Sequence, residues 1–157
     1  MQIVPCDLNI VLFEPEIPAN TGNIGRLCLG SGAKLHLIRP IRFLLDDKSL
    51  RRAGLDYWHK LDYQIWDSFA ELLASDPAAN FHFATTKTAN SYLDCAYKPG
   101  DYIVFGPESR GLPEDLLSEN AERCITIPMT GEIRSINLAN SVAIVLYEAI
   151  RQIGADH

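Results

Sequence analysis

The sequence predicts an α/β fold in which a six-stranded, mostly parallel sheet carries helices on both faces. Short apolar runs alternate with segments of helical character along the chain, and prolines, glycines or polar residues separate them. A helix between two strands carries the chain back across the sheet, so successive strands run parallel. At 157 residues, 47% of them hydrophobic, the chain is long enough to bury a core, and we expect one domain over residues 1–157.

Six apolar runs provide the expected strands. Residues 8–13 end at Glu14-Pro15 and residues 35–38 end before Pro40, which is typical of short buried strands. The four other expected strands are residues 63–66, 81–84, 102–105 and 124–127.

Helix start and stop signals lie between these runs. Asn20 is a favoured capping residue, so the first helix is expected from Asn20 to about residue 29, where Gly30-Ser31-Gly32 ends it. Asp46-Asp47 opens a second helix through residue 60, with acids at its N-terminus as the helix dipole favours. Two shorter helices are expected to about residue 74, capped by Asp67 or Ser68, and over residues 113–117.

The last expected helix, residues 137–153, is apolar nearly all round before Arg151. Such a helix must be buried on most sides. In a chain of this size a subunit interface is the simplest way to bury it, and a central core helix in a monomer is the alternative. We therefore expect a homodimer.

Charge and cysteine content restrict the class of protein. The net charge of −6 argues against a polyanion partner, yet basic residues gather in one short span and in two later loops, which leaves room for one basic face. The residues concerned are Arg26, Arg39, Arg42, Lys48, Arg51, Arg52, Arg110 and Arg134. The four cysteines form no C-x-x-C pair and are interpreted as reduced thiols of a cytoplasmic protein. The longest apolar run, residues 142–147, is too short to span a bilayer, so we expect no membrane segment.

Familiar catalytic motifs are missing from the sequence. It contains neither G-x-x-x-x-G-K-[ST] nor G-x-S-x-G, and Gly30-Ser31-Gly32 is not a complete dinucleotide fingerprint. No set of His, Cys and carboxylate residues has metal-ligand spacing, so we expect no metal. His36 and His82 lie within apolar strands and are interpreted as structural histidines with satisfied hydrogen bonds.

Three loops are expected to gather at the carboxyl ends of the strands, where parallel sheets bind ligands: residues 85–87, 106–111 and 129–135. The glycines and prolines of the second and third loops predict a pocket built mostly from backbone groups. Polar residues accompany them. Asn20-Thr21-Gly22-Asn23 with Arg26 predicts an anion site at a helix N-terminus, Glu108 and Arg110 flank the second loop, and Ser135 and Asn137 precede the last helix. Capping and surface turns are the alternative interpretation of all three sets.

Three motifs occur in a fixed order: residues 20–26, then Phe105-Gly106-Pro107-Glu108 with Gly111-Leu112-Pro113, then Ile127-Pro128-Met129 with Ser135 and Asn137. In these motifs the chain resembles the SPOUT superfamily of knotted RNA methyltransferases that use S-adenosyl-L-methionine (AdoMet). Residues 46–57 resemble the subgroup that methylates the ribose 2′-oxygen of the wobble nucleotide, cytidine or modified uridine 34, in the tRNA anticodon loop. Gly25 and Ala139 depart from that pattern, in which a larger apolar residue and a serine are usual.

The resemblance implies a deep C-terminal trefoil knot that binds AdoMet and forms the homodimer. The implied cofactor positions are Ala84, Thr85, Thr86, Gly106, Glu108, Ile127, Met129, Ser135 and Leu138. The implied catalytic residues are Asn20, Arg26, Ser135 and Asn137, and the implied tRNA contacts are Arg26, Arg51, Arg52 and Arg110. Because a guanidinium stays protonated at neutral pH, we interpret Arg26 as a phosphate clamp rather than a base. A non-catalytic RNA-binding dimer, and a methyltransferase for another RNA site, are the alternatives.

Overall fold

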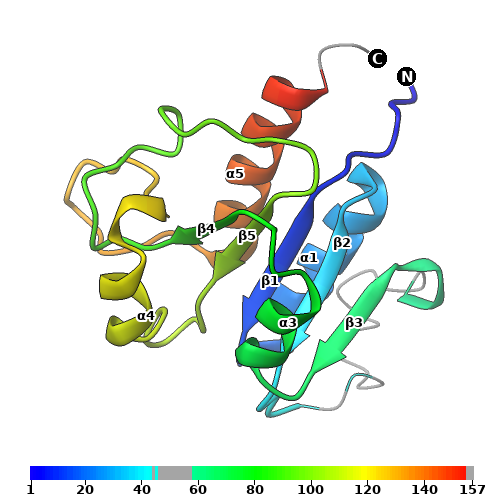
Figure 1. The fold of residues 1–157 in the computed structure, drawn as a ribbon, viewed down its shortest axis with the longest axis horizontal. Coiled ribbons are helices and arrows are strands. Elements are labelled where there is room, and N and C mark those ends of the chain that lie inside the picture. Colours follow the sequence, from blue (N-terminus) through cyan, green and yellow to red (C-terminus); the bar gives the residue numbers. More distant parts are fainter. Residues whose placement is uncertain (44, 46–57, 155–157) are drawn as a thin grey trace.

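The computed structural model describes residues 1–43, 45 and 58–154. Its centre is a six-stranded sheet with the strand order β3-β2-β1-β5-β4-β6 (Figure 1). Every pairing in this sheet is parallel. The strands are β1 (Asn9–Phe13), β2 (Lys34–Ile38), β3 (Tyr63–Trp66), β4 (Phe81–Ala84), β5 (Tyr102–Phe105) and β6 (Cys124–Ile125). The prediction of an α/β fold with a parallel sheet is confirmed.

Four α-helices and two 3-10 turns accompany the sheet in the described part of the chain. They are α1 (Pro18–Ser31), η1 (Trp58–Lys60), α3 (Phe69–Ser75), α4 (Glu114–Glu119), η2 (Ala121–Arg123) and α5 (Leu138–Ile153). The expected helix from Asp46 falls mainly on residues 46–57, which lie outside the described residues, and residues 58–60 form η1. Helix α4 begins one residue after the predicted start, because Pro113 is its N-cap, and it ends at Glu119.

Strand side chains alternate between two cores, one on each face of the sheet. On one face, Ile10, Leu12 and Leu35 pack with Ile24 of α1 and Leu146 of α5. On the other face, Val11, Ile38 and Val104 pack with Leu72 of α3 and Leu117 of α4. The helices therefore cover both faces, as predicted, and Figure 1 shows α3 and α5 on opposite sides of the sheet.

Helix α1 begins three residues earlier than predicted, because the expected N-cap is Asn20. Its N-cap is Ile17 and Pro18 follows at the first helical position, so Asn20 lies inside the helix rather than capping it. Pro18 favours this start because its fixed φ suits the first turn and the missing N–H would be unpaired there. The helix ends at Gly32, whose φ of 84° is left-handed, so Gly30 and Ser31 belong to the last turn.

Within the single chain, helix α5 is covered on one side, and the predicted subunit interface stays a prediction. Val142, Val145 and Leu146 are buried against the sheet, but Ile144 is 37% exposed and Tyr147 is 47% exposed. An apolar run therefore does not make every side of this helix part of the core of the chain, because one side packs on the sheet and Ile144 and Tyr147 are partly exposed. No helix in the described residues is long and apolar enough to cross a membrane.

Both strand histidines are structural, as predicted. His36 Nδ1 accepts a hydrogen bond from Trp66 at 3.0 Å and Nε2 contacts the Asn9 side-chain oxygen at 2.9 Å. Burial lowers the pKa of His36 to about 4, so the ring is neutral at pH 7. His82 is likewise held through both ring nitrogens, by Asp101 and Cys95. All four cysteines are free thiols, in agreement with the prediction.

Candidate functional site

The loops after β1, β4, β5 and β6 leave the sheet at the same edge, because all the strands run parallel. The three loops predicted from the sequence therefore lie at this edge, and a fourth segment, residues 14–17 after β1, lies there with them. The polar contacts at this edge centre on Glu108, in the loop after β5.

The Glu108 carboxylate binds the two residues that directly precede α1. It accepts hydrogen bonds from the backbone N–H groups of Glu16, at 3.1 Å, and Ile17, at 2.5 Å. A carboxylate at this position satisfies free N–H groups and faces the positive end of the helix dipole. The predicted anion site at this helix N-terminus is therefore wrong as a free site, because a side chain of the same chain already fills it.

The loop after β1 returns this contact. Glu16 accepts hydrogen bonds from the Ser109 backbone N–H at 2.9 Å and from the Ser109 hydroxyl at 2.7 Å. These bonds hold the pKa of Glu16 below its ordinary value. Glu14 pairs with Arg110 at 3.0 Å. The two loops are thus joined by reciprocal carboxylate contacts, which we call the carboxylate clamp: Glu14, Glu16, Glu108, Ser109 and Arg110.

Two side-chain amides connect the clamp to α5 through hydrogen bonds. The Asn20 side-chain N–H group donates to Glu108 at 3.5 Å, and its oxygen accepts from the Asn137 side chain at 3.0 Å. Asn137 caps α5 by accepting the Asn140 backbone N–H at 3.2 Å. Three residues that the sequence placed in separate motifs therefore meet in one hydrogen-bonded chain: Asn20, Glu108 and Asn137. Asn20 is buried at 7% exposure, whereas Glu108 is half-buried and Asn137 is exposed, so the set runs from the interior of the protein to its surface.

Gly106 is required by the close approach of its own loop. A Cβ at this position would overlap the backbone nitrogen of Leu112 and the carbonyl carbon of Gly111. Gly111 itself has a φ of 70°, a left-handed conformation that favours glycine. The loop consequently folds back on the end of β5, and its next residues bring Glu108 to α1.

The other implied cofactor positions surround this edge. Ala84, Ile127 and Leu138 are partly buried apolar residues that pack against the core on the α1 and α5 face. The Thr85 N–H donates to the Ile125 carbonyl at 2.9 Å, which joins the loop after β4 to β6. Thr86 and Ser135 are exposed, and Met129 is half-buried.

The loop before α5 offers unused hydrogen-bond donors. Within the described residues, the backbone N–H groups of Met129, Gly131 and Ser135 make no hydrogen bond in the chain. Free N–H groups beside partly buried Ile127 and Leu138 suit a ligand with an apolar ring and oxygen or nitrogen acceptors. The donor set and the apolar lining therefore fit AdoMet, which has an adenine ring, ribose hydroxyls and a carboxylate.

The basic residues are placed unequally. Arg26 is exposed on α1, the helix that also carries Asn20. Arg110 is in the carboxylate clamp, so part of its charge is already compensated by Glu14. Arg51 and Arg52, and the whole of the subgroup-like segment 46–57, lie outside the described residues.

A groove of about 460 Å³ lies between α1 and α5, lined by Asn23, Leu27, Asn137, Ala139, Asn140 and Ala143. Sequence reasoning did not nominate Asn140 or Leu27, and it missed Glu14 and Glu16 of the clamp. The sequence does contain two acids, Glu14 and Glu16, after the first strand and a basic residue, Arg110, after the fifth. Only the strand order shows that these two segments meet.

The structure shows what surrounds Gly25 and Ala139, the two residues that depart from the subgroup pattern. A Cβ at Gly25 would lie 2.8 Å from the Trp58 ring, so the glycine makes room for an indole against α1. Ala139 lines the groove between α1 and α5.

Comparison with known proteins places this site in context. The model of the SpoU rRNA methylase family matches residues 7–147. The tRNA (cytidine(34)-2′-O)-methyltransferase of Yersinia pestis is 51% identical over 154 residues, which cover 94% of each chain. The protein of the same name from Escherichia coli K12 is 48% identical over 148 residues, again 94% of each. A solved structure described as "Structural insights into the 2-OH methylation of C/U34 on tRNA" has a TM-score of 0.87 at 45% identity, covering 92% of this chain and 95% of the other.

Proposed function

Because this chain belongs to the SpoU rRNA methylase family, we propose that it transfers a methyl group from AdoMet to the ribose 2′-oxygen of nucleotide 34 in the tRNA anticodon loop. The observation that carries this proposal is the 51% identity to the Yersinia pestis enzyme over 94% of both chains. A substrate assignment from near-full-length similarity is stronger than one from fold alone, because one fold hosts many functions.

The cofactor site we propose lies at the carboxyl ends of β4, β5 and β6. Ile127 and Leu138 would cover the adenine ring, and the free N–H groups of Met129, Gly131 and Ser135 would bind its polar groups. Ala84, Thr85, Thr86 and Gly106 would form the remaining backbone wall. Glu108 acts indirectly in this proposal, since its carboxylate is engaged by α1 and Asn20.

When bound, AdoMet supplies an activated methyl group, so the protein must mainly orient the ribose and receive its proton. Arg26 would clamp the phosphate next to the target ribose and stabilise the developing negative charge on the 2′-oxygen. Asn20 and Asn137 hold each other at 3.0 Å, which fixes the first turn of α1 relative to the start of α5. Ser135 is exposed beside them and is free to contact the ribose.

The tRNA contacts we propose are Arg26, Arg51, Arg52 and Arg110. Arg110 would have to exchange its contact with Glu14 for a phosphate, or contact the phosphate with the part of the guanidinium that Glu14 leaves exposed. With a net charge of −6, binding depends on this local cluster rather than on the charge of the whole protein.

A homodimer through the knotted C-terminal region is part of the proposal. The exposed apolar residues of α5, Ile144 and Tyr147, together with the groove between α1 and α5, support it, because such a surface is expected to be covered by a second subunit.

The test is to incubate the purified protein with AdoMet and unmodified tRNA and to map the methylated nucleotide by mass spectrometry. We expect one methyl group, on the ribose of nucleotide 34. Methylation of another nucleotide or of a base would overturn the substrate assignment. Calorimetry with AdoMet separates the non-catalytic alternative, which predicts no heat of binding.

A further inference from the structure

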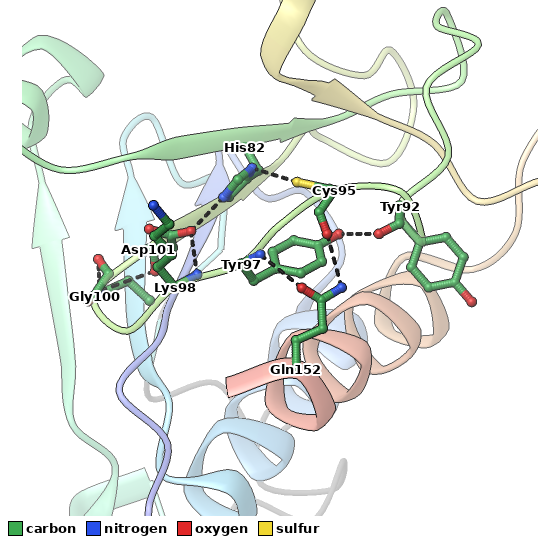
Figure 2. A network of polar contacts seen from close by, with 9 residues as sticks. His82, Tyr92, Cys95, Tyr97, Lys98, Gly100, Asp101 and Gln152 are labelled. Carbon is green, nitrogen blue, oxygen red and sulfur yellow. Dashed lines mark hydrogen bonds and ion pairs between the residues drawn. The ribbon is translucent and has the colours of Figure 1, made fainter. Parts of the chain in front are cut away.

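A long loop, residues 85–101, connects β4 to β5, and its two halves have different surroundings. The first residues, Thr85 and Thr86, lie at the proposed cofactor site. The second half contacts Gln152 near the C-terminal end of α5 and reaches Asp101, directly before β5. Figure 2 shows a network of polar side chains that holds this second half in place.

The deepest part of the network is a buried hydrogen bond between a histidine of β4 and an aspartate of the loop. Asp101 is 2% exposed, and its carboxylate contacts His82 Nε2 at 2.7 Å and accepts the Lys98 N–H at 2.9 Å. His82 Nδ1 lies 3.1 Å from the Cys95 sulfur. A buried carboxylate is tolerated only where its partners satisfy it, so residues 95–101 are closely fixed to β4.

Gln152, in the last turn of α5, fixes the same stretch from the other side. Its side-chain oxygen accepts the Tyr97 backbone N–H at 3.0 Å, and its nitrogen donates to the Cys95 carbonyl at 2.9 Å. One amide thus pairs with the backbone on both sides of residue 96, much as a neighbouring strand would. Figure 2 shows the Gln152 side chain reaching from the helix to this segment.

The contact continues from residue 97 to the cofactor edge. The Tyr97 hydroxyl donates to the Tyr92 carbonyl at 2.7 Å. The Tyr92 N–H donates to the Thr126 carbonyl at 2.9 Å, and the Thr126 N–H donates to the Asn90 carbonyl at 2.8 Å. Thr126 directly precedes Ile127, a proposed cofactor contact. A continuous series of hydrogen bonds therefore leads from Gln152 to the apolar wall of the cofactor site.

We propose that Gln152 is a positioning residue for the cofactor: it holds residues 92–97 so that Thr126, and with it Ile127 and the start of the loop at Thr85, keep their binding conformation. The inference rests on the proposed function. Gln152 touches neither cofactor nor substrate in this proposal, and it acts only through the loop.

The expected effect follows from the population of the binding conformation. If removing the Gln152 amide leaves that conformation populated about one tenth of the time, the apparent affinity for AdoMet falls about tenfold. The chemical step is unchanged once AdoMet is bound, because Arg26, Asn20 and Asn137 keep their contacts. The prediction is thus a higher KM for AdoMet with kcat preserved.

The experiment compares wild type, Gln152→Ala and Gln64→Ala in methyl-transfer assays with saturating tRNA and varied AdoMet. Gln64 is an exposed glutamine on the edge strand β3 and serves as the matched control. We expect the KM for AdoMet to rise about tenfold in Gln152→Ala only, with kcat within about twofold. An unchanged KM, or a fall in kcat alone, would overturn the inference, because a purely structural role reduces the amount of active enzyme without changing KM.

Two further measurements keep the inference testable. Tyr97→Phe removes one hydroxyl and keeps the ring, so it covers the case in which Gln152→Ala does not fold, and it too should raise the KM for AdoMet. Hydrogen exchange tests the positioning without activity: the Tyr92 and Tyr97 amides should exchange faster in Gln152→Ala, and equal exchange would refute the anchor. A wild-type protein that methylates no tRNA would instead refute the proposed function.

Discussion

Replacing Glu108 by glutamine should separate the charge of this residue from its shape. The carboxylate accepts two backbone N–H groups, those of Glu16 and Ile17, at the positive end of α1. The amide keeps one oxygen acceptor but turns an N–H₂ group towards a backbone donor. Hydrogen bonds to a charged group contribute about 1.5–3 kcal/mol, and we expect the free energy of unfolding to fall by about 2 kcal/mol.

Urea unfolding with circular dichroism measures this change, and for a chain of this length it corresponds to a decrease in Tm of about 4–8 °C. Glu114→Gln is the control, since Glu114 is 86% exposed and its pair with Lys87 is a surface ion pair. Methyl transfer should also fall in Glu108→Gln, because Asn20 loses the partner that orients it towards Asn137. If Glu108→Gln loses no more stability than Glu114→Gln, the carboxylate clamp does not hold α1 and the reasoning is wrong.

Three other predictions follow from the structure. Gly106→Ala should lower the free energy of unfolding by at least about 2 kcal/mol in urea titrations, because the new Cβ meets backbone atoms of Gly111 and Leu112. Gly131→Ala is the control: its Cβ meets only open space, and its φ of 98° should lower the free energy of unfolding by about 1 kcal/mol. His36 has a pKa of about 4 in the folded protein and about 6.5 when unfolded, so the unfolded state takes up the proton first as pH falls. Between pH 7 and pH 5 the free energy of unfolding should therefore fall by about 2 kcal/mol more in wild type than in His36→Gln. Parallel curves of the free energy of unfolding against pH for the two proteins would contradict this. Arg26→Gln should reduce the slope of log K for tRNA binding against log salt concentration by about 1, measured by filter binding, while Arg123→Gln leaves the slope unchanged.

Much of the fold could be predicted from local sequence. The strand bounds agree with the structure to within two residues. For the inner strands the reason is that burial on both faces demands continuous apolar sequence, whereas the edge strand β3 is half exposed. Ser68 caps α3 by accepting the Glu71 N–H, and Asn137 caps α5, as their residue types predict. These signals act over three or four residues, so a single sequence contains them.

The features that local sequence does not predict depend on contacts between distant residues. Asn20 has the better capping side chain, yet α1 begins at Pro18 because Glu108, 91 residues away from Ile17, supplies the acceptor. The insertion of β5 between β1 and β4 likewise leaves no local pattern, and it alone brings Arg110 to Glu14. The meeting of Asn20, Glu108 and Asn137 is predicted only in the sense that three polar sets occur at the carboxyl edge of the sheet.

The strand order also constrains how the chain can fold during synthesis. Strand β1 pairs on one side with β2, about 25 residues later, but its other partner is β5, whose first residue is Tyr102. While the first half of the chain emerges from the ribosome, β1 is therefore an open edge with apolar Ile10, Val11 and Leu12. Distant pairings of this kind slow folding, because the chain between them must be ordered before the contact is gained. The loops of the proposed active site can come together only after β5 has been inserted between β1 and β4. We therefore expect a slow step late in folding to coincide with the appearance of cofactor binding.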